Sequence, residues 1–132
     1  VIMAAHVLYP NIDGQPAGFS SFWIQKILRE ELKFDGVVFS DDLSMEGAAG
    51  VGNFADRAKI ALNAGCDMVL VCNNPTAAEQ VLNALPIENN PDRERRLQKM
   101  RGKFSLTREQ LQATQKWKQA AFFVQDFARS YS

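Results

Sequence analysis

Three short apolar runs, each followed by a segment of helical periodicity, constrain the fold of this chain more than any other feature. The runs are residues 1–7, 36–40 and 67–72, and the helical segments follow at 21–33, 53–63 and 75–85. Runs of this length without polar alternation are typical of strands buried on both faces of a parallel sheet. Their alternation with helices predicts parallel strands joined by right-handed crossovers, and therefore an α/β fold.

Capping residues place several helix boundaries. Asn53 is expected to cap the second helix, Gly65 to end it, and Pro75 to occupy the first position of the third. In the tail, Thr107 and Gln110 form a capping box that predicts the start of one long helix. The apolar stripe of that helix consists of Leu111, Trp117, Ala121, Val124 and Ala128.

Three strand–helix units leave two open sheet edges. A complete eight-unit barrel requires about 250 residues, and this chain has 132. We therefore expect residues 1–88 to be the last three βα units of a TIM-type (β/α)8 barrel, and residues 89–132 to be C-terminal helices that pack on it. The open edges are expected to be covered by the rest of the barrel or by self-association.

Charge and hydropathy exclude several partners. Fifteen acidic and fifteen basic residues cancel, so no overall field favours nucleic acid or an anionic membrane, and neither partner is expected. No apolar run is long enough to cross a bilayer. A basic cluster in the tail alternates with acidic residues and predicts a solvated helix face; it comprises Arg93, Arg95, Arg96, Lys99, Arg101 and Lys103.

Cys66 and Cys72 are the two cysteines. An extended segment between them would separate the sulfur atoms by about 20 Å, too far for a disulfide. Two free buried thiols are therefore expected, in a reducing, cytoplasmic compartment. Because no further cysteine or histidine lies near them, no metal site is expected there.

Two adjacent carboxylates, Asp41 and Asp42, follow the second apolar run. A buried carboxylate is costly, and ligands of α/β proteins bind at the carboxyl ends of the strands. Since successive residues of a regular strand point to opposite faces, one carboxylate can enter a site while the other supports it. Alternatively, both only solvate the strand end or start an Asx-turn.

The run from Ile27 to Ser44, which ends in Phe39-Ser40-Asp41-Asp42-Leu43-Ser44, resembles the active-site signature of family 3 glycoside hydrolases. More narrowly, it is similar to the bacterial β-N-acetylglucosaminidases of that family. Four further stretches carry the resemblance along nearly the whole chain: 3–7, 41–49, 64–74 and 102–111.

The resemblance implies that Asp41 is the nucleophile of a retaining reaction, supported by Ser40 and Asp42. It also implies a small-molecule substrate, N-acetylglucosamine linked to 1,6-anhydro-N-acetylmuramic acid in muropeptides of peptidoglycan recycling, and no cofactor or metal. His6, the only histidine, is a candidate ligand contact or a donor to a neighbouring site residue. The alternative is a satisfied histidine at the barrel rim.

The His-Asp acid/base pair and the upstream sugar-binding residues that the resemblance implies have no counterpart in these residues. Glu46 is a weaker candidate acid. Without a general acid, the rate of glycoside cleavage is lower by a factor of about 10² to 10⁴. The isolated chain is therefore expected to be inactive or nearly so. Two alternatives stay open: a family 3 phosphorylase, and a non-catalytic half-barrel that self-associates.

Overall fold

The computed structural model describes residues 1–102 and 106–130. The chain divides into two compact units, Val1–Met100 and Arg101–Ser132, and each is described by itself. The first unit extends beyond residue 88, the boundary that the sequence predicts, and includes a short helix at Pro91–Gln98 whose basic residues pair with Asp35 and Asp67, just before β2 and β3. The predicted packing of the remaining C-terminal helices on the barrel stays a prediction.

The first unit is built on a three-stranded parallel sheet in the order β1-β2-β3. The strands are β1 (Ile2–Ala4), β2 (Val38–Asp42) and β3 (Met68–Leu70). The predicted α/β fold with parallel strands is confirmed. The outer strands are shorter than their apolar runs, and only the middle strand reaches through both predicted carboxylates.

Helical segments connect the strands. In chain order they are the 3₁₀ turn η1 (Ala17–Phe19), the π-helix η2 (Phe22–Glu31), α1 (Glu46–Ala49), α2 (Phe54–Ala64), α3 (Pro75–Ala84) and α4 (Pro91–Gln98). The predicted caps are confirmed: Asn53 accepts from the N–H of Asp56, and Gly65 ends α2 at a φ of 116°. Pro75 occupies the first turn of α3.

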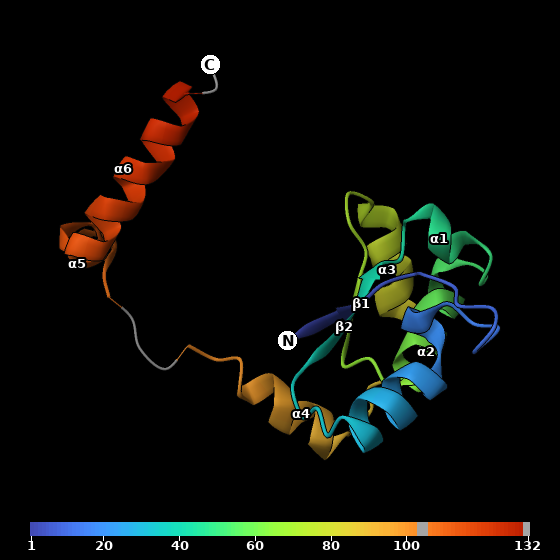
Figure 1. Cartoon of the computed structure of the whole chain (residues 1–132). Helices are drawn as coiled ribbons and strands as arrows, with labels where there is room; N and C mark the ends of the chain where they lie inside the picture. Colours follow the sequence, from blue (N-terminus) through green and yellow to red (C-terminus); the bar gives the residue numbers. More distant parts are fainter. Residues whose placement is uncertain (103–105, 131–132) are drawn as a thin grey trace. The chain divides into compact units, whose positions relative to one another are not determined.

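The helices cover one face of the sheet, where the core lies. Val38 is fully buried in a cluster with Ile24 of η2, Ala58 and Ala61 of α2, and Val81 of α3. Figure 1 shows α2 and α3 on the same side of β1 and β2. On the other face, Met3 and Met68 flank Phe39 in register and remain 53% and 38% exposed. This open face contrasts with the fully covered strands that the sequence predicts.

Helix α4 is attached to the first unit through its basic residues. Arg96 binds the buried carboxylate of Asp67 with its Nη2 2.7 Å from Oδ1, while Arg95 and Lys99 pair with Asp35 at the surface. The prediction of a solvated basic face is therefore wrong for Arg96, whose side chain is 14% exposed. Lys103 lies outside the described residues.

The second unit contains α5 (Arg108–Ala113) and α6 (Gln115–Ser130). The capping box of Thr107 and Gln110 is confirmed, but the single long helix is wrong. Thr114 takes an extended conformation, with a ψ of 145°, and its Oγ1 accepts from the N–H of Trp117. A threonine that caps the next turn in this way breaks the helix. No helix among the residues that the structure describes is long and apolar enough to span a membrane.

Candidate active site at the carboxyl ends of the strands

A β-bulge in β2 lies at Ser40 and Asp41. Phe39 is opposite Met68 and Asp42 is opposite Leu70, so three steps along β2 match two along β3. The Ser40 hydroxyl compensates for the broken ladder, since its Oγ accepts from the N–H of Leu70 at 3.1 Å. Bulges are found beside active sites, where they redirect a side chain. Here the redirected position is Asp41, a residue that the sequence singles out.

The Asp42 carboxylate is fully engaged with the protein. Its Oδ1 accepts from the N–H groups of Ser44 and Cys72 at 2.9 and 3.0 Å, and its Oδ2 accepts from the Ser44 hydroxyl at 2.6 Å. Burial acts to raise the pKa of Asp42, but these hydrogen bonds outweigh it and hold the pKa below its usual value. Asp42 thus makes the Asx-turn that the sequence allowed, and it also joins the ends of β2 and β3.

Asp41 has a different environment. Its side chain is half-buried, and its Oδ1 accepts from the N–H of Asp42 at 2.9 Å. Within residues 1–102 and 106–130, the other oxygen of Asp41 has no hydrogen-bond partner. The two neighbouring carboxylates therefore differ as the sequence suggested: one is committed to structure, and one keeps an oxygen available.

His6 follows β1 and reaches toward this carboxylate pair. Its Nε2 lies 3.2 Å from the main-chain oxygen of Asp42, and its ring stacks on Phe19 with centroids 4.6 Å apart. The structure thus brings His6, Ser40, Asp41 and Asp42 together at the carboxyl ends of β1 and β2. Glu46 is exposed at the start of α1.

Cys72 is a site neighbour that the sequence analysis did not identify. The prediction that both cysteines are buried is wrong here: Cys66 is buried, whereas Cys72 is exposed because it lies beyond the end of β3. Both thiols are free, as predicted. Burial and the charge of Asp42 raise the pKa of Cys72, and burial with the charge of Asp67 raises the pKa of Cys66 to about 12.

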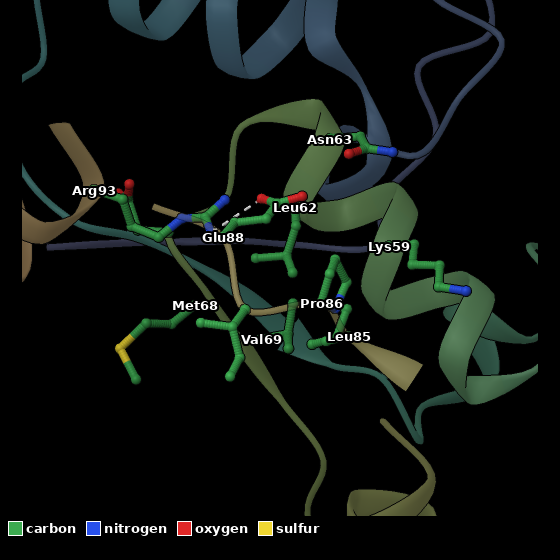
Figure 2. Close-up of a pocket in the computed structure, with 11 residues that line it drawn as sticks. Lys59, Leu62, Asn63, Met68, Val69, Leu85, Pro86, Glu88 and Arg93 are labelled. Atoms are coloured by element: carbon green, nitrogen blue, oxygen red, sulfur yellow. Dashed lines mark ion pairs between the residues drawn. The ribbon is translucent and has the colours of Figure 1, made fainter. Parts of the chain in front are cut away.

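A pocket of about 520 Å³ lies at the opposite, amino end of β3 (Figure 2). Met68 and Val69 of β3, Leu62 of α2 and the segment 85–88 line it, and Glu88 pairs with Arg93 across 3.7 Å. Neither Asp41 nor His6 is among its lining residues. Since chemistry in α/β folds is found at carboxyl strand ends, we assign the candidate site to Asp41 rather than to this pocket.

No group of three or more His, Cys, Asp or Glu side chains is arranged to hold a metal ion in the part of the chain that the structure describes. The groups that the chain places at the strand ends are the carboxylates of Asp41 and Asp42, the hydroxyl of Ser40, main-chain amides and the imidazole of His6. A carboxylate with one unengaged oxygen can act as a nucleophile or stabilise a developing positive charge.

A parallel sheet with a half-buried carboxylate at the carboxyl end of its middle strand is an arrangement found in α/β proteins, including the barrel-type enzymes that use carboxylate chemistry. Residues 1–100 match the profile of the glycosyl hydrolase family 3 N terminal domain, and the chain belongs to that family. A beta-hexosaminidase from Idiomarina loihiensis is 52% identical over 120 residues, which are 90% of this chain and 36% of that protein.

The chain is also similar in structure to solved proteins. NagZ from Neisseria gonorrhoeae in complex with zinc ion matches with a TM-score of 0.77 and 39% identity, over 92% of this chain and 35% of that one. NagZ from the same organism in complex with N-trifluoroacetyl-D-glucosamine gives a TM-score of 0.73 and 40% identity, over 90% and 34% of the two chains. The chain thus spans about a third of the length of these relatives.

Proposed function

We propose that this chain is the C-terminal part of the barrel of a retaining exo-β-N-acetylglucosaminidase, in which Asp41 is the nucleophile. One observation carries the proposal: Asp41 lies at the bulge that ends β2 and keeps an unpartnered oxygen, while both oxygens of Asp42 are engaged. Membership of glycosyl hydrolase family 3 and the similarity to beta-hexosaminidases support it.

The three strand–helix units are proposed to be the last three of a (β/α)8 barrel. The sheet has β1 and β3 at its edges, and one of its faces is open. In a closed barrel, further strands pair with these edges and the open face becomes the barrel interior. The pocket beside Met68 lies along the edge of β3, where a neighbouring unit would fill it.

In this mechanism Asp41 attacks the anomeric carbon of the sugar and forms a glycosyl ester as the leaving oxygen departs. A general acid protonates the leaving oxygen and then, as a base, takes a proton from the water that attacks the anomeric carbon. The bond to Asp41 breaks, which releases the sugar with retained configuration and regenerates the carboxylate. Asp42 fixes the rim by joining β2 to the segment after β3, and Ser40 secures the bulge. The reaction as proposed needs no cofactor.

The proposed substrate is a muropeptide in which N-acetylglucosamine is linked to 1,6-anhydro-N-acetylmuramic acid, as in cytoplasmic peptidoglycan recycling. The complex of the Neisseria gonorrhoeae relative with N-trifluoroacetyl-D-glucosamine supports an N-acylated glucosamine in the site. The general acid/base is proposed to come from outside these 132 residues, because their one histidine contacts the main chain of Asp42. The isolated chain is accordingly proposed to be inactive.

The decisive experiment is covalent trapping in the complete enzyme. An activated 5-fluoro derivative of N-acetylglucosamine should label Asp41, as located by mass spectrometry of the digested protein. Asp41→Ala should lose both labelling and turnover, whereas Asp126→Asn, at an exposed position of α6, should keep both. Labelling at another carboxylate, or turnover by Asp41→Ala, refutes the assignment. Product analysis with and without phosphate distinguishes hydrolysis from phosphorolysis.

A further inference from the structure

We propose that His6 is a positioning residue for Asp41, acting through the main chain of Asp42. Nε2 of His6 lies 3.2 Å from the carbonyl oxygen of Asp42, and the N–H of Asp42 donates to Oδ1 of Asp41 at 2.9 Å. The catalytic consequence rests on the proposed function, whereas the two hydrogen bonds themselves do not.

The contact selects one tautomer of the imidazole. A carbonyl oxygen only accepts, so the hydrogen must be on Nε2 of His6. Nδ1 is shielded from solvent and has no hydrogen-bond partner among the described residues. The other neutral tautomer would bury an N–H without an acceptor and place two acceptors face to face. The ring therefore has no nitrogen left for a sugar, which favours positioning over direct ligand contact.

Packing holds the ring in this orientation. It lies parallel to the ring of Phe19, with an interplanar angle of 5°. A Cβ at Gly47 would stand 3.1 Å from both the Cβ and the carbonyl oxygen of His6. A Cβ at Gly18 would stand 3.2 Å from Nδ1 and 2.8 Å from the oxygen of Ala4. Both glycines thus allow an approach that a side chain would obstruct.

The hydrogen-bonded pairing of β2 with both neighbouring strands is interrupted just before Asp42. Pairing of β1 with β2 ends at Ala4 and Ser40, and the bulge interrupts the pairing with β3 until Asp42. The His6 side chain, which follows β1, contacts Asp42 beyond the last backbone pair between β1 and β2. The Asp42 carbonyl accepts from the N–H of Met45 at 3.1 Å as well, so it is fixed from two directions.

The first test is structural and uses the complete protein. Nitrogen NMR of the His6 ring, assigned by the loss of its signals in His6→Gln, should show the Nε2–H tautomer. A Nδ1–H tautomer or an even mixture overturns the proposal.

Gln can present its amide N–H near the Nε2 position, whereas Asn cannot. Loss of the His6 contact in His6→Asn should loosen the main chain at Asp42, so exchange of its amide, which donates to Asp41, should accelerate by up to about tenfold, the factor that one ordinary hydrogen bond represents, and less in His6→Gln.

The amide of Leu85, which donates to Val81 at the end of α3, is the remote control. Equal acceleration at Leu85 and Asp42 in His6→Asn would mean that His6 only supports the fold, and would overturn the proposal. In assays of turnover, His6→Asn should lower kcat about tenfold with little change in KM, and His6→Gln should lower kcat less. An equal loss of kcat in the two variants, or an effect on KM alone, would contradict a positioning role for His6. If Asp41→Ala stays active, the proposed function fails while the tautomer and exchange results stand.

Discussion

The Oδ2 atom of Asp67 accepts from Nη2 of Arg29 at 2.8 Å and from the N–H of Val38 at 2.9 Å, so one buried carboxylate joins η2 to the first residue of β2. Its Oδ1 accepts two hydrogen bonds from Arg96 of α4. The side chain of Asp67 is 1% exposed. A buried carboxylate that satisfies two guanidinium groups holds three elements in place at the amino end of the strands.

Removal of this carboxylate should be strongly destabilising. In Asp67→Ala, Arg29 and Arg96 lose their common partner while they remain 12% and 14% exposed. Breaking a buried pair by removing one partner costs about 3–5 kcal/mol of the free energy of unfolding. Urea unfolding of the complete protein, followed by circular dichroism, measures the effect.

Asp35→Ala is the matched control, because Asp35 also pairs with basic residues of the α4 segment. Its partners are Arg95 of α4 and Lys99 at the end of that helix, but the Asp35 side chain is 51% exposed. Solvent screening makes such pairs weak, so its removal should change the unfolding midpoint much less than removal of Asp67. Equal midpoints for the two variants would contradict the structural importance of the buried carboxylate.

The bulge should depend on one hydroxyl. Ser40 is fully buried, and its Oγ accepts from the N–H of Leu70, which has lost its ladder partner. Ser40→Ala leaves this N–H unsatisfied and should cost about 1–3 kcal/mol of stability. Ser44→Ala is the control, because Ser44 is exposed and water can replace its hydroxyl. Hydrogen exchange at Leu70 should accelerate in Ser40→Ala only; protection unchanged from the wild type would refute the role of Ser40.

The sequence predicted the sheet because its signals are local. Apolar runs, Asn53 as a cap and Gly65 as a terminator act within a few residues, and each is found where it was expected. The adjacency of Asp41 and Asp42 allowed two different roles for the carboxylates, and equally a shared role in solvating the strand end. The roles themselves still rest on the proposed function.

The interactions that the sequence did not reveal join distant residues. Arg29 and Asp67 are 38 positions apart, and nothing in the local pattern around either distinguishes a buried pair from solvated charges. The bulge at Ser40 likewise depends on the pairing of β2 with β3 rather than on a local signal. Thr114 is a local signal of the break between α5 and α6: a threonine three residues before Trp117 can cap a new helix.

Acid should destabilise the first unit through two carboxylates. Hydrogen bonds from Arg95 and Lys99 hold the pKa of Asp35 below its usual value of 3.8, and the pKa of Asp42 is also lowered. A group whose pKa is lower in the folded state stabilises it above the unfolded-state value. That stability is lost as the pH falls from about 4 through the folded-state pKa. Unfolding midpoints measured between about pH 2 and 6 should therefore decline at the acid end.

Replacement of Asp42 and Asp35 tests whether these two carboxylates cause the loss of stability in acid. Asp42→Asn keeps an acceptor oxygen but cannot ionise, so the acid-induced decline in its midpoint should be shallower than in the wild type. Asp35→Asn should act in the same direction. A decline of unchanged steepness in the double variant would show that other carboxylates control the acid response.

The two thiols should differ in reactivity because only one is accessible. Cys66 is 1% exposed, and burial raises its pKa to about 12, so it is both shielded from the reagent and held in the unreactive thiol form. Cys72 is exposed, although its pKa is also raised. Within the 132 residues, a thiol reagent should modify Cys72 alone in the native protein and both cysteines in concentrated urea, as mass spectrometry of the digested peptides can show.

Cys72→Ser provides the control for this experiment, since native labelling of this segment should then disappear. Its backbone N–H still donates to Asp42, so the rim should stay intact and stability should change little. If Cys66 reacted as fast as Cys72 in the native protein, the core beneath α2 would have to open on the timescale of labelling. Such a result would contradict the close packing of Cys66 with Ala61 and Ala64 in the core cluster.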